Sequence, residues 1–343
     1  MTRPDAIQPE EVALEPALSI VDAHHHLRER GGERFLLPEF LATVTTGHRI
    51  VATVAVETAV MYRPDGPEEL RAVGETEFLN EVADTCVASG VLRAGAGIVG
   101  AANLGLGDRV RPVLEAHIAA AGKRFRGVRS LAAWDASESL RMKRAQPPAG
   151  LLLDRTFREG FAELAAFGLS FDTWIFHTQL ADVMDLARAF PDTAIILNHV
   201  GGPIGIGRFA GRHDEVFTHW RQKIREVAQY PNIFIKLGGL GMPVMGFAFA
   251  GRQERASSLE LANAWYPYIE TCIELIGPVR CMFESNFPSD RAACSYEVLW
   301  NAFKRIVRAY SDSEKAALFR ETAIRAYQLT ELPAHIYEVA GIQ

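Results

Sequence analysis

Short apolar runs alternate with longer segments of helical periodicity along nearly the whole chain. A short run of mainly apolar residues predicts a strand, whereas apolar residues that recur every three or four positions predict an amphipathic helix. The runs that fit a strand are 19–23, 50–57, 91–99, 125–130, 170–176, 194–198, 232–237 and 279–284. The segments with helical spacing are 108–121, 156–167, 179–190, 215–230, 259–276 and 296–310.

This alternation of strands and helices predicts an α/β fold with parallel strand pairing. Eight such units fit a closed (β/α)₈ TIM barrel. An open doubly wound sheet is the alternative, but no Gly-x-Gly-x-x-Gly motif follows the first strand, where a dinucleotide-binding fold would carry it. We expect one domain over residues 1–343, with an N-terminal arm of about 17 residues and C-terminal helices from about residue 313. Long loops at 135–154 and 238–258 would line the C-terminal rim as lids or substrate walls.

Three histidines follow the first predicted strand, at positions 24 to 26. Successive side chains of a strand point to opposite faces, so His24 and His26 share one face and His25 points the other way. Two imidazoles on one face at a strand's carboxyl end suit a divalent metal or a proton-transfer site.

Ionisable side chains end six of the other seven predicted strands. They are Glu57, Arg129, His177, His199, Lys236 and Glu284. Any one of them could be a core residue or half of a structural ion pair. In a barrel, however, the carboxyl ends of all strands meet at one rim, where catalytic groups gather. Their coincidence at strand ends therefore predicts a functional site.

Composition excludes several classes of protein. The chain has 343 residues, 48% hydrophobic and 23% charged, and a net charge of −6 without a basic block, so nucleic acid is not an expected partner. No apolar run approaches the roughly 20 residues of a membrane span, and the acidic first 15 residues do not resemble a secretory signal. The four cysteines form no Cys-x-x-Cys pair, which predicts free thiols in a reducing cytoplasm. We expect a cytoplasmic protein that acts on a small molecule, with homo-oligomerisation left open.

Five stretches, in this order, resemble the amidohydrolase superfamily. They are VDAHHHL (21–27), VAVE (54–57), RGVR (126–129), ILNHVGGP (196–203) and MFESNFP (282–288). The closest likeness is to the family 2 branch that contains sugar-acid lactonases and a pyrone-dicarboxylate lactonase. The resemblance spans roughly residues 18 to 330 and implies a (β/α)₈ barrel that catalyses hydrolysis at a carbonyl or lactone carbon.

The sequence departs from that superfamily after the eighth strand. The family usually has an aspartate there, in a Ser-Asp-Trp-Pro-like segment, and this chain has Asn286. An amide is neither a base at neutral pH nor a good zinc ligand. Glu284 lies on the same strand face and Asp290 lies in the following loop, so either carboxylate, or His199, would replace it. Arg129 stands where a lysine would bridge two metals, so we do not expect a binuclear centre.

We therefore predict a lactone hydrolase in which water attacks the carbonyl of a sugar-acid or small carboxylated lactone. The expected catalytic residues are Glu284, Asp290 and His199; the expected substrate-binding residues are Glu57, Arg129, Lys236 and Asn286; the expected metal ligands are His24, His26 and His177. One Zn²⁺ or Mn²⁺ suits such imidazoles, and a metal-free site stays open. The alternatives are a metal-dependent decarboxylase of an aromatic acid and, because of Asn286, a non-catalytic ligand-binding barrel.

Overall fold

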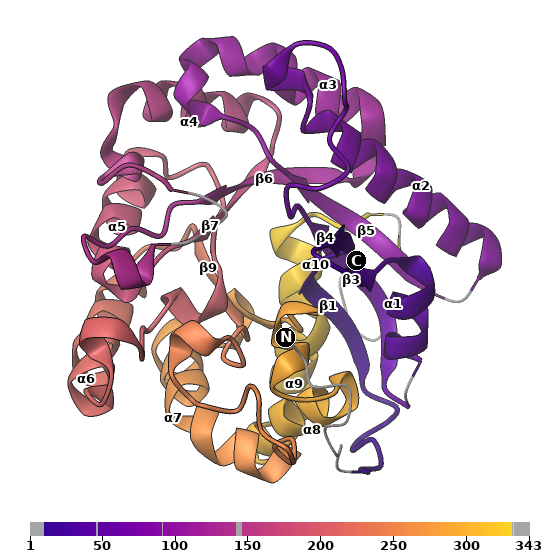
Figure 1. Cartoon of the computed structure of the whole chain (residues 1–343), viewed down its shortest axis with the longest axis vertical. Helices are drawn as coiled ribbons and strands as arrows, with labels where there is room; N and C mark the ends of the chain where they lie inside the picture. The colour runs from indigo at the N-terminus through magenta and orange to yellow at the C-terminus, as the bar shows by residue number, and fades with distance from the viewer. Residues whose placement is uncertain (1–9, 46, 91, 142–145, 331, 333–343) are drawn as a thin grey trace.

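The computed structural model describes residues 10–45, 47–90, 92–141, 146–330 and 332. Its centre is an eight-stranded sheet in which every pair of neighbours is parallel and the strand order follows the chain (Figure 1). The strands are β1 (Ser19–His25), β4 (Arg49–Val56), β5 (Arg93–Gly100), β6 (Phe125–Leu131), β7 (Ser170–Trp174), β8 (Ile195–Leu197), β9 (Ile233–Leu237) and β10 (Cys281–Phe283). All eight predicted strands are present, although Val91 of the third lies outside the described residues.

The sheet closes through a short seam between its last and first strands. The amide of Asn286 donates to the carbonyl of His24 at 2.8 Å, and the amide of His26 donates to the carbonyl of Phe287 at 2.7 Å. These bonds lie beyond the end of β10, where the chain is no longer a regular strand. The closure confirms the predicted barrel over the open sheet, and it joins the histidine motif directly to the segment around Asn286.

Helices cover the outside of the sheet (Figure 1). Those that the periodicity predicts are α3 (Arg111–Ala121), α4 (Arg155–Ala166), α5 (Leu180–Ala189), α6 (His213–Val227), α7 (Ser258–Ile276) and α8 (Tyr296–Ile306). Two further helices, α1 (Leu37–Val44) and α2 (Val73–Ser89), were not predicted from the sequence. In α2 the reason is that polar Glu75 and Thr76 are buried together with Leu79 and Val82, so the buried face is not marked by apolar residues alone.

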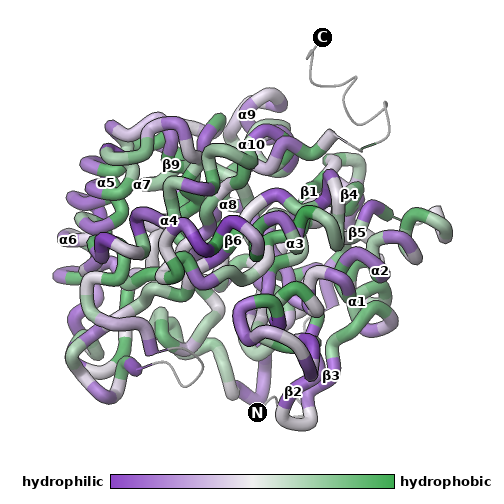
Figure 2. Tube along the Cα trace, turned by 90° about the horizontal axis from the view of Figure 1, so that it is seen from above, coloured by the Kyte–Doolittle hydropathy of each residue, from purple (hydrophilic) through white to green (hydrophobic). Residues whose placement is uncertain are grey.

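A small antiparallel hairpin follows β1, formed by β2 (Arg28–Arg30) and β3 (Glu33–Phe35). Gly31 and Gly32 form its turn, with φ angles of +59° and +81° that glycine adopts without strain. In Figure 2 the hairpin lies at the opposite end of the molecule from α9 (Asp312–Ala316) and α10 (Thr322–Ala326). The hairpin therefore belongs to the C-terminal rim and the last helices to the N-terminal end of the barrel.

The C-terminal helices close the N-terminal end of the barrel. A π-helical turn, Ala317–Glu321, joins α9 to α10. An apolar cluster inside the barrel consists of strand residues together with residues of α10 and the segment after it: Val21, Ala23, Ala52, Val54, Val56, Val99, Ile196, Met282, Ala323, Ala326, Tyr327, Leu329 and Leu332. The predicted C-terminal helices thus exist as far as α10, while residues 331 and 333–343 lie outside the described part of the chain.

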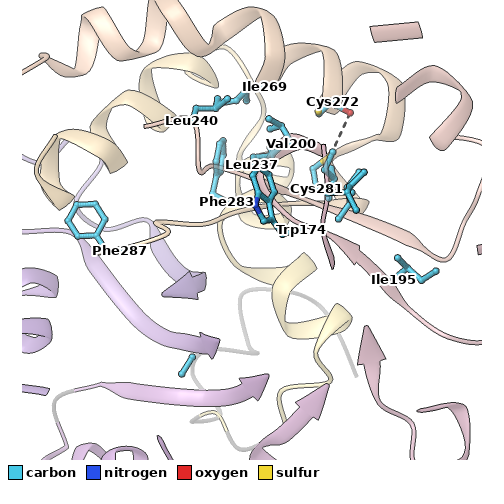
Figure 3. Close-up of a cluster of buried hydrophobic side chains, with 14 of the residues drawn as sticks. Trp174, Ile195, Val200, Leu237, Leu240, Ile269, Cys272, Cys281, Phe283 and Phe287 are labelled. Atoms are coloured by element: carbon cyan, nitrogen blue, oxygen red, sulfur yellow. Dashed lines mark hydrogen bonds between the residues drawn. The ribbon is translucent and has the colours of Figure 1, made fainter. Parts of the chain in front are cut away.

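A larger apolar core fills the space between the strands and the outer helices (Figure 3). Phe283 and Cys281 of β10 and Ile269 of α7 belong to it. The thiol of Cys281 contacts the carbonyl of Cys272 at 3.6 Å, and all four cysteines are buried and free. Within the described residues, no helix combines the length and the apolar character that a membrane crossing requires.

Tyr327 offers a test of how the C-terminal segment supports the interior. Its hydroxyl donates to both carboxylate oxygens of Asp172, at 2.9 Å each. Tyr327→Phe leaves the packing unchanged but removes a hydrogen bond to a buried charge, so it should lower the free energy of unfolding by about 1.5–3 kcal/mol. Denaturant unfolding measures this, with the half-exposed Tyr266→Phe as the control that should change nothing. Equal stabilities of the two variants would contradict the assignment.

Candidate active site

Lys236, on β9, is a fully buried cation at the centre of the site. Its ammonium donates to Asp172 on β7 at 2.8 Å and lies 3.1 Å from Nδ1 of His24. Asp172 also accepts hydrogen bonds from the side-chain amide of Asn198, at 2.8 Å, and from the hydroxyl of Tyr327. A buried charge is tolerated only when it is paired and hydrogen-bonded, and Asp172 provides that pairing.

Arg129, on β6, is the second buried cation. Its Nε donates to a carboxylate oxygen of Glu57 at 2.7 Å, and its Nη2 donates to the backbone carbonyl of the same residue. Its Nη1 lies 3.2 Å from Nε2 of His24. Glu57 and Arg129 therefore form a buried ion pair, and Nη1 of Arg129 faces the histidine motif.

The two neighbouring histidines, His24 and His26, have different partners. Each ring nitrogen of His24 faces a group that can only donate: the ammonium of Lys236 lies 3.1 Å from Nδ1, and Nη1 of Arg129 lies 3.2 Å from Nε2. Nδ1 of His26 faces the carbonyl of Val56 at 2.8 Å and must carry its proton. Nε2 of His24 lies 3.2 Å from Nε2 of His26. Burial, followed by the charge of Lys236, holds the pKa of His24 well below its usual range, which agrees with a neutral ring.

Glu284 connects the histidine motif to His199. One of its oxygens accepts from Nδ1 of His199 at 2.6 Å and from the backbone amide of that residue at 3.2 Å. Its other oxygen, Oε2, lies 3.0 Å from Nδ1 of His24 but receives no hydrogen bond from the described residues. The rings of His24 and His199 lie 4.9 Å apart, so the two sequence motifs meet at this carboxylate.

The turn that presents His199 requires its glycines. His199 and Val200 have φ angles of +54° and +48°, a region that costs a non-glycine residue energy and recurs at functional sites. Gly202 also has a positive φ, and a Cβ there would lie 2.0 Å from the carbonyl oxygen of Ile175. The Gly-Gly pair therefore allows the tight turn that directs the ring of His199 toward Glu284.

A second glycine pair, after β9, makes room for the same two side chains. A Cβ on Gly238 would lie 2.5 Å from Cγ of Glu284, and a Cβ on Gly239 would lie 2.4 Å from the ring of His199. Any side chain at either position would displace the carboxylate or the imidazole. These glycines were not among the residues expected from the sequence to form the site.

Asn286 and Asp290 form a separate pair next to the seam. Asn286 has a φ of +52°, a conformation that asparagine tolerates better than most residues. Its amide donates to one oxygen of Asp290 at 2.8 Å, and the amide of Gly241 donates to the other at 3.1 Å. Burial, with a smaller contribution from the charge of Glu284, raises the pKa of Asp290 to about 8.

His177 lies apart from this group. It is buried, its Nδ1 accepts from the amide of Ile204 at 3.4 Å, and its ring packs against Phe209 and His219. Burial lowers its pKa to about 4. The structure thus brings together nine of the ten predicted site residues, in two contacting groups, and leaves His177 in separate surroundings.

His25 points away from the site, as strand alternation predicts. Its ring stacks on Phe40 of α1 at 4.3 Å, and its Nε2 bonds to the hydroxyl of Thr53 at 2.8 Å. A substitution of His25 would therefore disturb packing on the outer side of the barrel and not the candidate active site.

Two supporting carboxylates, Asp172 and Asp22, are not among the site residues predicted from the sequence. Asp172 is the one charged residue in β7, a signal that the sequence contains. Asp22 accepts from the amide of Ser285 at 2.8 Å and from the hydroxyl of Tyr296 at 3.0 Å, and burial raises its pKa to about 6. It holds the segment after β10 against β1, on which the placement of Glu284 depends.

The residues present fit one divalent cation. Among the described residues, donor atoms of His24, His199 and Glu284 lie within 4.8 Å of one another. Two imidazoles and one carboxylate are a donor set that zinc accepts while keeping a position open. Oε2 of Glu284, which has no hydrogen-bond partner among the described residues and lies 3.0 Å from Nδ1 of His24, is an anionic position that a cation would satisfy. This set shares His24 with the expected one but contains neither His26 nor His177.

Comparisons with known proteins agree with this architecture. The sequence profile of the family described as amidohydrolase matches residues 21–329. The uncharacterized protein y4mH of Sinorhizobium fredii is 33% identical over 296 residues, 86% of each chain. L-fucono-1,5-lactonase of Burkholderia multivorans is 32% identical over 183 residues, 52% of this chain and 57% of that protein. A crystal structure of an amidohydrolase from Burkholderia multivorans with bound zinc superposes with a TM-score of 0.68 over 92% of this chain and 99% of that one, at 25% identity.

Gly239→Ala tests the space next to His199. The added methyl group would overlap the imidazole, and overpacking of this kind costs typically about 1–3 kcal/mol. Gly211→Ala is the matched control, because Gly211 has a similar φ of +74° with no atom within 4 Å of its Cβ position. Denaturant unfolding should show a larger loss for Gly239→Ala than for Gly211→Ala. Identical losses would mean that backbone conformation alone, and not the imidazole, makes glycine necessary there.

The raised pKa of Asp290 predicts a dependence of stability on pH. The native pKa of about 8 lies above the ordinary value of 3.8, so the native state binds the proton more tightly. The resulting stabilisation is complete below about pH 4 and is lost as the pH rises through about 8. Relative to Asp290→Asn, the free energy of unfolding of the wild type should fall between pH 5 and 9 in a denaturant series. A difference that is constant with pH would refute the shift.

Proposed function

The chain belongs to the amidohydrolase family, and we propose that it hydrolyses a lactone by attack of water on the lactone carbonyl. The observation that carries the proposal is that Asp290 and the buried cations lie on the two sides of the seam. Asp290, a buried carboxylate with a pKa of about 8, is hydrogen-bonded to Asn286. Asn286 is hydrogen-bonded to the backbone of His24, and the ring of His24 lies beside Arg129 and Lys236. A proton acceptor with a pKa near neutrality, next to donors for an oxyanion, suits addition of water to a carbonyl. The lactonase relative supports the choice of substrate class.

In this proposal the carbonyl oxygen is bound by donors that converge near β1. Nη1 of Arg129, held in place by the ion pair with Glu57, lies 3.2 Å from Nε2 of His24 and would be one of these donors. Lys236 adds a positive charge at 3.1 Å from the other nitrogen of His24. Donors that are already fixed by Glu57 and Asp172 need no reorganisation when negative charge develops on the oxygen, and such preorganisation stabilises the transition state.

Asp290 would take the proton from water. Asn286 and Gly241 hold its two oxygens, so the carboxylate keeps a fixed orientation. Water adds to the carbonyl carbon as its proton moves to Asp290. The ring C–O bond of the tetrahedral intermediate then breaks, and the same proton passes to the departing alkoxide. The product is an open-chain hydroxy acid, which above its own pKa releases one net proton per turnover.

Glu284 serves a different purpose in this scheme. It fixes the imidazoles, since one of its oxygens accepts two hydrogen bonds from His199 and the other lies 3.0 Å from Nδ1 of His24. A divalent ion held by His24, His199 and Glu284 would supply Lewis acidity that polarises the carbonyl. Asp290 stands outside that set, so its part in the proposal does not depend on the ion.

A panel of lactones tests the proposed function. The purified protein, with its metal content measured by elemental analysis, is mixed with L-fucono-1,5-lactone and other sugar-acid lactones in a weak buffer containing a pH indicator. Acid release without CO₂ supports hydrolysis. Release of CO₂ from aromatic carboxylic acids would instead identify a decarboxylase, and tight binding of a lactone without turnover would identify a binding protein. The panel is repeated after chelation to establish whether a metal is needed.

Asp290→Asn should lower kcat by about 10²–10⁴-fold, as expected for loss of a general base, while substrate still binds. His25→Ala is the control, because His25 faces the outside of the barrel and should leave kcat nearly unchanged. Steady-state kinetics on the best lactone of the panel measures both. Full activity in Asp290→Asn combined with a large loss in Glu284→Gln would transfer the role of base to Glu284.

A further inference from the structure

A cavity of about 650 Å³ opens at the C-terminal rim beside the candidate active site. It is lined by the hairpin β2–β3, by the start of the short helix Pro243–Met245 and by the segment after β10. Its charged lining residues are four arginines and one glutamate: Arg28, Arg30, Arg34, Arg291 and Glu33. We call it the arginine cavity. With four guanidinium groups and one carboxylate, the lining of this concave surface carries a net positive charge.

The arginine cavity shares its walls with the catalytic loops. The hairpin begins two residues after His26, and Pro243 follows Gly241, which binds Asp290, by two residues. Ser289 lines the cavity, whereas Asp290, the next residue, is fully buried on the side of Asn286. The loop that carries Ser289 and Asp290 therefore borders both the cavity and the surroundings of Asp290, and a substrate bound at Asp290 would pass this loop to reach the cavity.

The positive charge of the cavity is only partly neutralised within the protein. Arg28 pairs with Glu33 at 2.9 Å, and Arg34 pairs with Glu39 at 3.3 Å and with Glu29 at 3.8 Å. For Arg30 and Arg291, no ion pair with any described residue is present. Two of the four guanidinium groups are thus available to an anion from solution, and Arg28 is held by a single carboxylate.

Arg30 is fixed in place without being neutralised. Its Nη2 donates to the backbone carbonyls of Thr58 and Ala59, at 2.8 Å each. These residues directly follow Glu57, the carboxylate that holds Arg129. Because carbonyls carry no net charge, they orient the guanidinium and leave its charge intact. An arginine that is oriented in advance loses less entropy when it binds a carboxylate or phosphate in bidentate fashion.

We propose that the arginine cavity binds an oxyanion group, a carboxylate or a phosphate, that the substrate carries at the end remote from its lactone carbonyl. This inference rests on the proposed lactonase function for the identity of the substrate, but the binding of an anion does not. Arg30 and Arg291 form the contacts, and Glu33 limits affinity by occupying Arg28. The preferred substrates are then acidic lactones, and neutral lactones bind more weakly.

Calorimetric titration at low ionic strength tests binding directly, with sodium phosphate and sodium glutarate as the two probes. At least one probe should bind, and its Kd should increase roughly tenfold or more in Arg30→Gln and in Arg291→Gln, the effect of losing a charge-assisted hydrogen bond. Arg49→Gln is the control, since it removes the same charge from the start of β4, at the other end of the barrel. The probe that binds more tightly distinguishes phosphate from carboxylate recognition.

Glu33→Gln gives a change of opposite sign. Removing this carboxylate frees Arg28, so the Kd for the bound probe should decrease. The net charge changes by one unit, as in the arginine variants, but toward positive. Absence of binding by both probes, or equal affinity in wild type, Arg30→Gln and Arg291→Gln, overturns the proposal. Weakened binding in Arg49→Gln to the same degree would reduce it to a general effect of net charge.

Kinetics separates this inference from the proposed function. The substrates are D-glucono-1,5-lactone, which is neutral, 6-phospho-D-glucono-1,5-lactone and D-glucaro-1,4-lactone, which carries a carboxylate. An acidic lactone should show the lowest KM, and Arg30→Gln should raise that KM without changing kcat or the kinetics of the neutral lactone. Hydrolysis with equal KM for all three would refute the arginine cavity and leave the lactonase intact. Anion binding that depends on Arg30, without hydrolysis of any lactone, would do the reverse.

Discussion

The requirement that every buried charge be paired organises the interior of this barrel. Lys236 and Arg129 bring two cations into a space from which water is excluded, and removing an ion from water costs several kcal/mol unless a partner offsets it. Asp172 and Glu57 provide those partners. Each cation is held by a carboxylate from two strands away in the barrel, and its remaining donor atoms point to a ring nitrogen of His24.

The same requirement explains why distant segments have to meet. Asp172 is balanced by Lys236 and completed by Tyr327, which comes from the segment after α10. The apolar cluster inside the barrel, to which Tyr327 belongs, therefore contributes one hydroxyl to a hydrogen-bond network that extends to the C-terminal rim. The seam that joins Asn286 to β1 also places Glu284 beside the ring of His24. The site therefore requires the closed barrel.

Sequence patterns predicted the barrel and most of the rim because both follow from local periodicity. Strand alternation separates His24 from His25, and the end of each strand identifies groups such as Arg129 and Glu284. Patterns could not reveal contacts that depend on three-dimensional closure, such as Tyr327 with Asp172 or Gly239 with the ring of His199. His177 shows what position along the chain leaves open: it lies three residues after β7, and its ring packs against Phe209 and His219.

Asn286 illustrates how a departure from a family pattern can be understood from local geometry. Its position has a left-handed backbone, which asparagine tolerates, and its amide donates where a carboxylate could only accept. That donor holds Asp290 next to the seam, and burial raises the pKa of Asp290 to about 8. An ionised aspartate at position 286 would have no hydrogen to donate, so it could not hold the carboxylate of Asp290 in this orientation. The geometry of Asp290 therefore depends on the amide of Asn286.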